Sequence, residues 1–171
     1  MAEIYVITGA PCTGKTTVLH ELEKEGYKIL GECTREAAEI AGNWSESGKP
    51  ERFDRIIFEL RKKQIEEAKS KEGVFFSDRG IGDGIAFFKI KGGKEVPKDM
   101  AEYSKSVSYE KVFVFDLLGF YELGENRKSP QEKQESIQKE IIKVYGEMDC
   151  EIVLVPKLSV EERINFVLGK I

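Results

Sequence analysis

The feature that most constrains this chain is a glycine-containing loop between a short apolar segment and a helical one. Its sequence, Gly9-Ala10-Pro11-Cys12-Thr13-Gly14-Lys15-Thr16, fits the phosphate-binding pattern GxxxxGK[ST] at every fixed position. Residues 4–8 read as a buried strand, and residues 16–25 repeat apolar side chains at helical spacing. In this order, the loop's backbone N–H groups can surround a phosphate at the positive end of the helix. We therefore expect a phosphate-binding strand, loop and helix.

The loop also predicts how a nucleoside triphosphate binds. Lys15 is expected to reach the β and γ oxygens, and Thr16 to bind Mg²⁺. The sequence has no guanine-reading NKxD motif, which favours ATP and leaves GTP open. The expected phosphate-binding residues are Gly9, Ala10, Pro11, Cys12, Thr13, Gly14, Lys15, Thr16 and Thr17.

Strand-like and helical patterns alternate along the rest of the chain. Strands are predicted at 27–31, 74–77, 111–115 and 151–155, and helices at 34–41, 52–71, about 82–91, and after Ser129 and Ser159. Thr34 is the expected cap of the helix over 34–41. Strands joined by helical crossovers favour a parallel sheet covered on both faces. The expected fold class is α/β, in a single domain over residues 1–171.

Phosphoryl transfer also needs carboxylates, which belong at the C-terminal ends of parallel strands. Asp78 follows the apolar run 74–77, and we assign it to Mg²⁺, directly or through water. Capping of the next helix is the structural alternative. Asp116 ends another apolar strand and is the rival metal ligand. Glu32, at the end of the second strand, is either a general base or a first-turn acid that complements a helix dipole.

Cationic side chains near these carboxylates are candidates for binding anions. Arg79 adjoins Asp78 and could neutralise charge during transfer. Arg35 could hold a substrate or form a surface ion pair. Residues 118–130 contain glycines and basic residues, which predicts a lid that excludes water and brings Arg127 to the phosphates. An ordinary solvated loop is the alternative for this segment.

Composition excludes several other classes of protein. The net charge is -4 and the sequence has no long basic block, so nucleic acid is not the expected partner. No apolar run approaches the roughly 20 residues of a membrane span, and no signal-like leader is present, so we expect a cytoplasmic protein without a membrane partner. Cys12, Cys33 and Cys150 form no CxxC pair, which favours reduced thiols over a zinc site.

Together these motifs resemble the NadR-like predicted-ATPase family of AAA-type P-loop proteins, which is close to nucleoside and nucleotide kinases. The resemblance covers nearly the whole chain. It is carried by Gly9–Thr16, Glu32 with Arg35, the triplet Asp78-Arg79-Gly80 with Asp83, the Arg127 segment, and Val155-Pro156.

The resemblance implies the fold of the P-loop kinases, with five parallel strands in the order 2-3-1-4-5. It also implies that Arg127 acts on the phosphates, and the expected catalytic residues are therefore Lys15, Asp78, Arg79, Glu32 and Arg127. Acceptor contacts are expected from Glu32, Arg35 and Asp83. Nucleoside kinases usually carry several lid arginines, whereas here Arg127 is followed by Lys128.

The leading hypothesis is ATP-dependent phosphorylation of a small-molecule acceptor, nucleoside-like, nucleotide-like or another small metabolite. The alternative is an ATPase or GTPase that acts as a nucleotide-dependent switch or binding module for a protein partner. A nucleic-acid end kinase is a third candidate, which the acidic balance disfavours.

Overall fold

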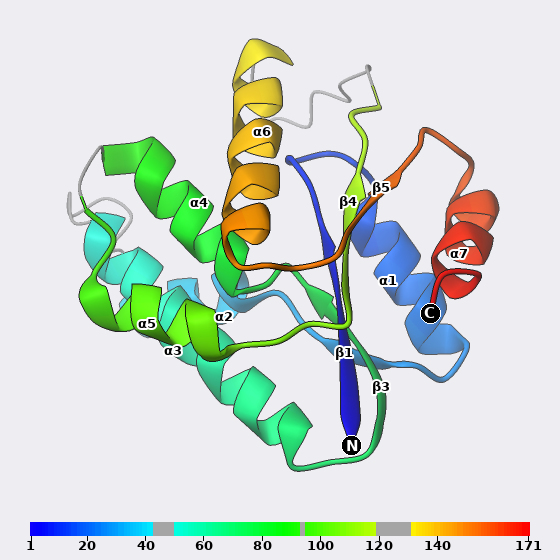
Figure 1. The fold of residues 1–171 in the computed structure, drawn as a ribbon, viewed down its shortest axis with the longest axis horizontal. Helices are drawn as coiled ribbons and strands as arrows, with labels where there is room; N and C mark the ends of the chain where they lie inside the picture. The colour runs from blue at the N-terminus through cyan, green and yellow to red at the C-terminus, as the bar shows by residue number, and fades with distance from the viewer. Residues whose placement is uncertain (43–49, 93–94, 119–130) are drawn as a thin grey trace.

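A computed structural model describes residues 1–42, 50–92, 95–118 and 131–171 of the chain. The described residues form a central sheet with helices packed on both sides (Figure 1). The strands are β1 (Ala2–Thr8), β2 (Lys28–Leu30), β3 (Gly73–Asp78), β4 (Lys111–Phe115) and β5 (Ile152–Val155). The helices are α1 (Lys15–Lys24), α2 (Cys33–Ala41), α3 (Pro50–Lys69), α4 (Ile81–Gly92), α5 (Lys98–Ser106), α6 (Gln131–Glu147) and α7 (Val160–Leu168).

All strand pairs are parallel, and the sheet order is β2-β3-β1-β4-β5. The predicted α/β class and strand order are therefore confirmed. The strand order changes direction beside β1. Because β1 and β3 are parallel neighbours, the chain segments that follow them start at the same, carboxyl-terminal end of the strands. In the register, Ile7 of β1 lies opposite Asp78 of β3. This pairing brings the phosphate loop and the first strand-end carboxylate together.

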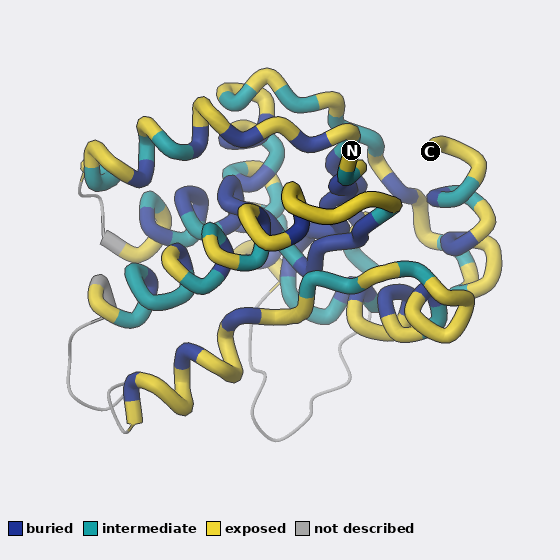
Figure 2. The backbone as a smooth tube through the Cα atoms, turned by 90° about the horizontal axis from the view of Figure 1, so that it is seen from below, coloured by how far each residue is buried: buried dark blue, intermediate teal, exposed yellow. Residues whose placement is uncertain are grey.

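Alternating side chains divide the core between the two faces of the sheet. Ile4 and Val6 pack with α3, α4, α5 and α6, whereas Tyr5 and Ile7 pack with α1 and α7. This is the period-2 alternation of a strand buried on both faces. Figure 2 shows the sheet buried at the centre, with exposed positions recurring along the outer helices.

Several local predictions differ from the structure. Thr34 does not cap α2; Glu32 holds the N-cap position, and its side chain makes no capping hydrogen bond. The helix begins earlier because Cys33 is buried and belongs to its inner face. Helix α5 was not predicted, since only Met100 and Ser104 of this polar segment are buried. The Ser159 capping box, by contrast, is confirmed at the start of α7.

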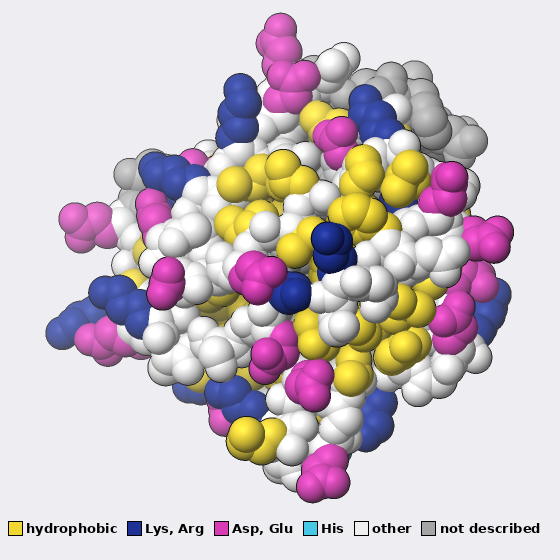
Figure 3. Space-filling view, turned by 45° about the vertical axis from the view of Figure 1, so that its right-hand side comes forward, with side chains coloured by type: hydrophobic (Ala, Val, Ile, Leu, Met, Phe, Trp, Pro, Cys, Tyr) yellow, Lys and Arg dark blue, Asp and Glu magenta, His cyan; other side chains and the backbone are white. Residues whose placement is uncertain are grey.

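Strand β5 forms one edge of the sheet and leaves apolar surface in contact with solvent. The side chain of Leu154 is 61% exposed. On the face drawn in Figure 3, hydrophobic side chains gather toward the middle, with acidic and basic side chains interspersed around them. Among the described residues, no helix combines the length and apolarity needed to cross a bilayer.

Candidate active site

The phosphate loop connects β1 to α1 through a backbone that turns sharply. Gly9, Cys12 and Gly14 have φ values of 135°, 63° and 82°. These left-handed conformations are easy for glycine and uncommon for a residue with a side chain. Two side-chain contacts stabilise the loop: the Thr13 hydroxyl donates to the Ala10 carbonyl at 3.1 Å, and the Ala10 N–H donates to the Gln138 amide oxygen of α6 at 3.3 Å.

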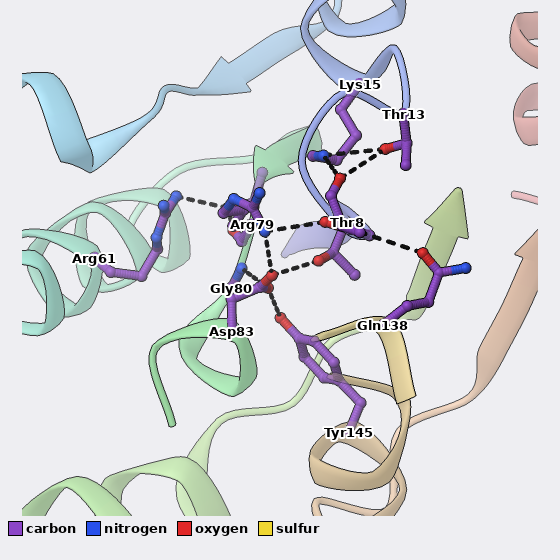
Figure 4. A network of polar contacts seen from close by, with 12 residues as sticks. Thr8, Thr13, Lys15, Arg61, Arg79, Gly80, Asp83, Gln138 and Tyr145 are labelled. Carbon is purple, nitrogen blue, oxygen red and sulfur yellow. Dashed lines mark hydrogen bonds and ion pairs between the residues drawn. The ribbon is translucent and has the colours of Figure 1, made fainter. Parts of the chain in front are cut away.

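Lys15 lies over the loop and is almost completely buried. Its ammonium donates to the Ala10 carbonyl at 2.7 Å and to the Thr13 hydroxyl at 3.1 Å (Figure 4). Burial and, to a lesser extent, the nearby Arg79 guanidinium lower the pKa of Lys15 to about 7, against the opposing effects of Asp78 and Asp83. A bound phosphate would favour the charged ammonium, so nucleotide binding and protonation of Lys15 should be linked.

This linkage predicts proton uptake on nucleotide binding. Because the pKa of Lys15 is lowered to about 7, its ammonium in the free protein loses more of its proton at pH 8.5 than at pH 7. Binding of MgADP should therefore take up more proton at pH 8.5 than at pH 7, and affinity should fall as pH rises through this window. Calorimetric titration in two buffers of different ionisation enthalpy measures the uptake. The same uptake at both pH values would contradict the linkage.

The residues after β3 place a carboxylate and a guanidinium beside the loop. Asp78 is 7% exposed, and burial raises the pKa of its carboxyl group, although Arg79 and Lys15 oppose the shift. The Arg79 N–H donates to the Ile7 carbonyl at 3.0 Å, which continues the β1–β3 ladder. Arg79 itself has φ 68°, an uncommon value for a residue with a side chain. This backbone turn directs its guanidinium toward the phosphate loop.

A buried network centred on Asp83 fixes the Arg79 side chain. One Asp83 oxygen accepts from the Thr8 hydroxyl and from Arg79, the latter at 2.9 Å; the other accepts from the Gly80 N–H at 2.9 Å and from the Tyr145 hydroxyl at 2.6 Å. Arg79 also donates to the Gly9 carbonyl at 3.1 Å (Figure 4). The Asp83 carboxylate is thus occupied by protein donors, which suits a residue that positions Arg79.

Gly80, the last residue of the triplet Asp78-Arg79-Gly80, leaves space for this network. A Cβ atom on Gly80 would lie 2.5 Å from the Tyr145 hydroxyl oxygen, closer than real Cβ contacts come. Asp83, rather than Asp78, bonds to the backbone N–H before α4. The structure therefore gives no capping bond to Asp78 among the described residues and leaves its carboxylate facing a cavity.

Removal of the Tyr145 hydroxyl tests the network. Tyr145→Phe should lower the free energy of unfolding by about 1–3 kcal/mol, because a buried carboxylate loses one of its donors. Catalysis should weaken several-fold through Arg79. Urea denaturation and steady-state kinetics measure the two effects. Tyr109→Phe is the comparison for catalysis: it also removes a buried hydrogen bond, that from the Ile81 N–H at 3.0 Å, but it leaves Asp83 and Arg79 with all their partners and should not weaken catalysis through Arg79. Wild-type stability of Tyr145→Phe would contradict the prediction.

Glu32 lies between two cavities at the end of β2. A cavity of about 400 Å³ is lined by Thr16, Glu32, Arg35 and Asp78, among others. Glu32 also lines the second cavity, of about 240 Å³. Because its side chain makes no capping bond to α2, the carboxylate is not used as a helix cap. The structure thus brings Thr16, Glu32, Arg35 and Asp78 to the wall of one cavity.

The second cavity is lined by apolar groups and by charged groups that sequence reasoning did not assign. Its charged lining includes Asp54 and Lys91, which form a 2.8 Å ion pair, and the buried Arg61. Apolar lining comes from Phe53, Ile57, Phe58, Ile81 and Phe87. Arg79 and Asp83 complete the wall nearest the phosphate loop.

Arg61 of α3 connects the segments that carry the strand-end carboxylates. Its guanidinium donates to the Gly31 carbonyl at 3.3 Å and to the Ser77 hydroxyl at 3.4 Å. Ser77 in turn donates to the Arg79 carbonyl at 2.6 Å. These contacts join the residue before Glu32 to the residues around Asp78. The one signal for these Arg61 contacts is that Arg61 is buried. The periodicity of the sequence does not reveal that burial.

Other predicted residues lie apart from these contacts. Asp116 is exposed at the end of β4, where one carboxylate oxygen accepts from the Leu117 N–H at 2.8 Å. Arg127 and most of the predicted lid, residues 119–130, lie outside the described residues, as does the predicted Ser129 cap. Among the described residues, no group of three His, Cys, Asp or Glu side chains could hold a metal ion by itself. Thr16 and Asp78 could hold Mg²⁺ only together with other ligands, such as phosphate oxygens or water.

A glycine-containing loop with a lysine over it, at the switch point of a 2-3-1-4-5 parallel sheet, defines a P-loop protein of the kinase-like fold. A family model described as an AAA domain matches residues 4–163. The chain belongs to this family. The comparisons give no separate support for the narrower NadR-like name.

Solved structures agree on the fold over almost the entire chain. Deoxyadenosine kinase from M. mycoides, with products dCMP and dCDP bound, is 20% identical, with 98% of this chain and 97% of that chain covered and a TM-score of 0.73. Thymidylate kinase from Ehrlichia chaffeensis is 13% identical; the match covers 99% of this chain and 98% of that chain, with a TM-score of 0.65. Shikimate kinase from Aquifex aeolicus is 20% identical; the match covers 97% of this chain and 94% of that chain, with a TM-score of 0.61. A search of the curated proteins found no match.

Proposed function

We propose that this protein transfers the γ-phosphoryl group of ATP, with Mg²⁺, to a small-molecule acceptor. The observation that carries the proposal is that Glu32 lines both cavities. One cavity includes Thr16 and Asp78 beside the phosphate loop, and the other extends away from it past Arg79. A phosphotransferase needs donor and acceptor sites that meet where the phosphoryl group is transferred, whereas a hydrolytic switch needs no second site.

In this proposal, the loop residues Gly9 to Thr17 bind the phosphates and Lys15 stabilises their charge. Thr16 and Asp78 would hold Mg²⁺, which would neutralise phosphate oxygens and orient the γ-phosphoryl group. Arg79 stabilises developing charge from a position fixed by Asp83. Glu32 accepts the proton of the acceptor hydroxyl as the new P–O bond forms, and ADP leaves. Arg35, which lines the larger cavity with Glu32, would contact a polar group of a bound substrate.

The lining of the smaller cavity supports an acceptor with both a flat apolar part and polar groups. Phe53, Phe58 and Phe87 can pack against a ring, and Arg61 with the Asp54–Lys91 pair can bind polar edges. A nucleoside-like or nucleotide-like compound has this chemistry. The fold likeness to deoxyadenosine, thymidylate and shikimate kinases supports the choice of a small acceptor. Arg127 remains the predicted lid cation.

The direct test is ADP formation from ATP and Mg²⁺, alone and with a panel of nucleosides, nucleoside monophosphates and small hydroxylated metabolites. We expect one compound class to stimulate ADP release strongly and to appear as a phosphorylated product by mass spectrometry. GTP in place of ATP tests the donor base. A slow rate that no acceptor changes would reject phosphotransfer and favour the ATPase switch.

A further inference from the structure

The last helix contributes a buried cation that the proposed mechanism does not use. Arg163 of α7 is only 6% exposed and lies on the side of the sheet covered by α1 and α7. Its guanidinium carbon is 5.6 Å from the centre of the Phe115 ring, a cation–π arrangement. It donates a hydrogen bond of 2.8 Å to the Thr13 carbonyl, in the phosphate loop.

Burial of this arginine costs free energy that its contacts do not fully return. No described carboxylate pairs with it, and its buried Nε has no hydrogen-bond partner among the described residues. Burial also lowers the pKa of Arg163. An apolar side chain at this place would avoid the cost of a buried, incompletely paired charge. Stability of the fold therefore does not account for an arginine here.

The position of Arg163 on α7 is set by strong local signals. Ser159 accepts from the Glu162 N–H while the Glu162 side chain accepts from the Ser159 N–H, a complete capping box. Ile164 and Val167 bury the inner face of the helix against the core shared with α1. Since both the start and the face of α7 are fixed, Arg163 is held at a definite place beside the loop.

The hydrogen bond to Thr13 determines how the Thr13–Gly14 peptide is turned. This peptide is trans, as are all the others described, so its C=O and N–H point in opposite directions. With the carbonyl directed toward Arg163 on α7, the Gly14 N–H points away from α7. The Arg163 guanidinium packs closely against the backbone of Gly14, since a Cβ atom on Gly14 would lie 2.8 Å from an Arg163 nitrogen.

We propose that Arg163 is a positioning residue for phosphate binding: by holding the Thr13 carbonyl outward, it turns the Gly14 N–H toward the bound phosphates. The proposal rests on the proposed function, because it assumes that the loop binds the phosphates of a nucleotide. Within the phosphate loop, Arg163 bonds to the Thr13 carbonyl of the backbone, so it acts on the phosphates through the loop.

The test uses Arg163→Met in the full chain, with Mg²⁺-tripolyphosphate as the ligand. Tripolyphosphate lacks a base and a sugar, so its affinity reports the phosphate site alone. We expect the variant to bind it on the order of 10- to 100-fold more weakly, since small displacements of positioned groups have effects of this size. In ¹⁵N-labelled protein, the Gly14 amide resonance should move on titration in the wild type and much less in the variant. Arg55→Met is the control variant. Arg55 also lies over an aromatic ring, Phe58, but is far along the chain from the loop. The Arg55→Met protein should bind tripolyphosphate with wild-type affinity.

Each result has a distinct meaning. Wild-type affinity and an unchanged Gly14 response in a folded Arg163→Met would overturn the inference and leave the proposed function intact. Failure of the wild type to bind tripolyphosphate or ATP would instead overturn the proposed function. If Arg163→Met does not fold, Arg163→Lys decides the question, because it keeps the charge but replaces the planar guanidinium with a single amine. We expect weaker binding and a reduced Gly14 shift in that variant; wild-type values for both would reject the role.

Discussion

Replacing Lys15 by methionine is expected to lower kcat/KM for ATP on the order of 10³-fold while the protein stays folded. Lys15 is the cation nearest the loop carbonyls, and its ammonium lies 2.7 Å from the Ala10 oxygen. Loss of a preorganised charge from a buried phosphate site has among the largest effects on transfer. Steady-state measurement of ADP release with saturating acceptor gives the value. Lys24→Met, on the exposed end of the same helix, should retain wild-type turnover.

The stability of Lys15→Met separates loss of function from loss of fold. In the folded state the pKa of Lys15 is lowered to about 7, so between about pH 7 and 10 the unfolded chain binds more protons there than the folded one. The free energy of unfolding should therefore rise with pH across this window, through the Lys15 contribution. In Lys15→Met the free energy of unfolding should lack this part of the increase with pH. Near pH 7 the variant should be at least as stable as the wild type. Urea denaturation at several pH values measures it, and unchanged turnover in the variant would reject the proposed site.

Asp78→Asn is expected to reduce kcat on the order of 10²-fold and to raise the Mg²⁺ concentration needed for half-maximal activity. Asp78 is 7% exposed at the end of β3 and lines the same cavity as Thr16. Asparagine keeps the shape of the side chain and removes its charge. Because burial raises the pKa of Asp78, the substitution should not destabilise the fold strongly. Rates measured across a Mg²⁺ titration give both quantities.

Asp116→Asn is the matched control for the metal assignment. Asp116 also ends a buried parallel strand, but it is exposed and bonds to its own neighbour's N–H. The control should show a wild-type response to Mg²⁺. The opposite pattern, with a normal response in Asp78→Asn and an altered one in Asp116→Asn, would move the metal role to Asp116.

Much of the fold could be predicted because its signals are local. The loop pattern, the apolar strands and the Ser159 capping box each lie within a few residues, and β4 has the predicted bounds. Helix α5 could not be found this way, since it buries only Met100 and Ser104 and otherwise carries the polar side chains of a loop. The sheet order followed from the family resemblance, because periodicity does not reveal which strands are neighbours.

The sequence marks Asp83 as an expected acceptor contact, but its supporting contacts within the protein were not predictable, for a related reason. Asp83 meets Thr8 across 75 positions and Tyr145 across 62. Such contacts depend on tertiary packing and leave no pattern in a sequence window. Glu32, Lys15 and Asp78 could be named because strand ends and a fixed motif mark them. The contacts that orient them could be found only once the strands were side by side.

The hydrogen bond between Thr13 and Arg163 joins residues 150 positions apart. During translation the loop sequence leaves the ribosome early, whereas the guanidinium that holds its backbone follows only when α7 has been made. A nascent chain would thus carry the nucleotide-binding motif long before it carries the conformation of the mature loop. Such a late contact also slows folding, because the intervening chain must be ordered first.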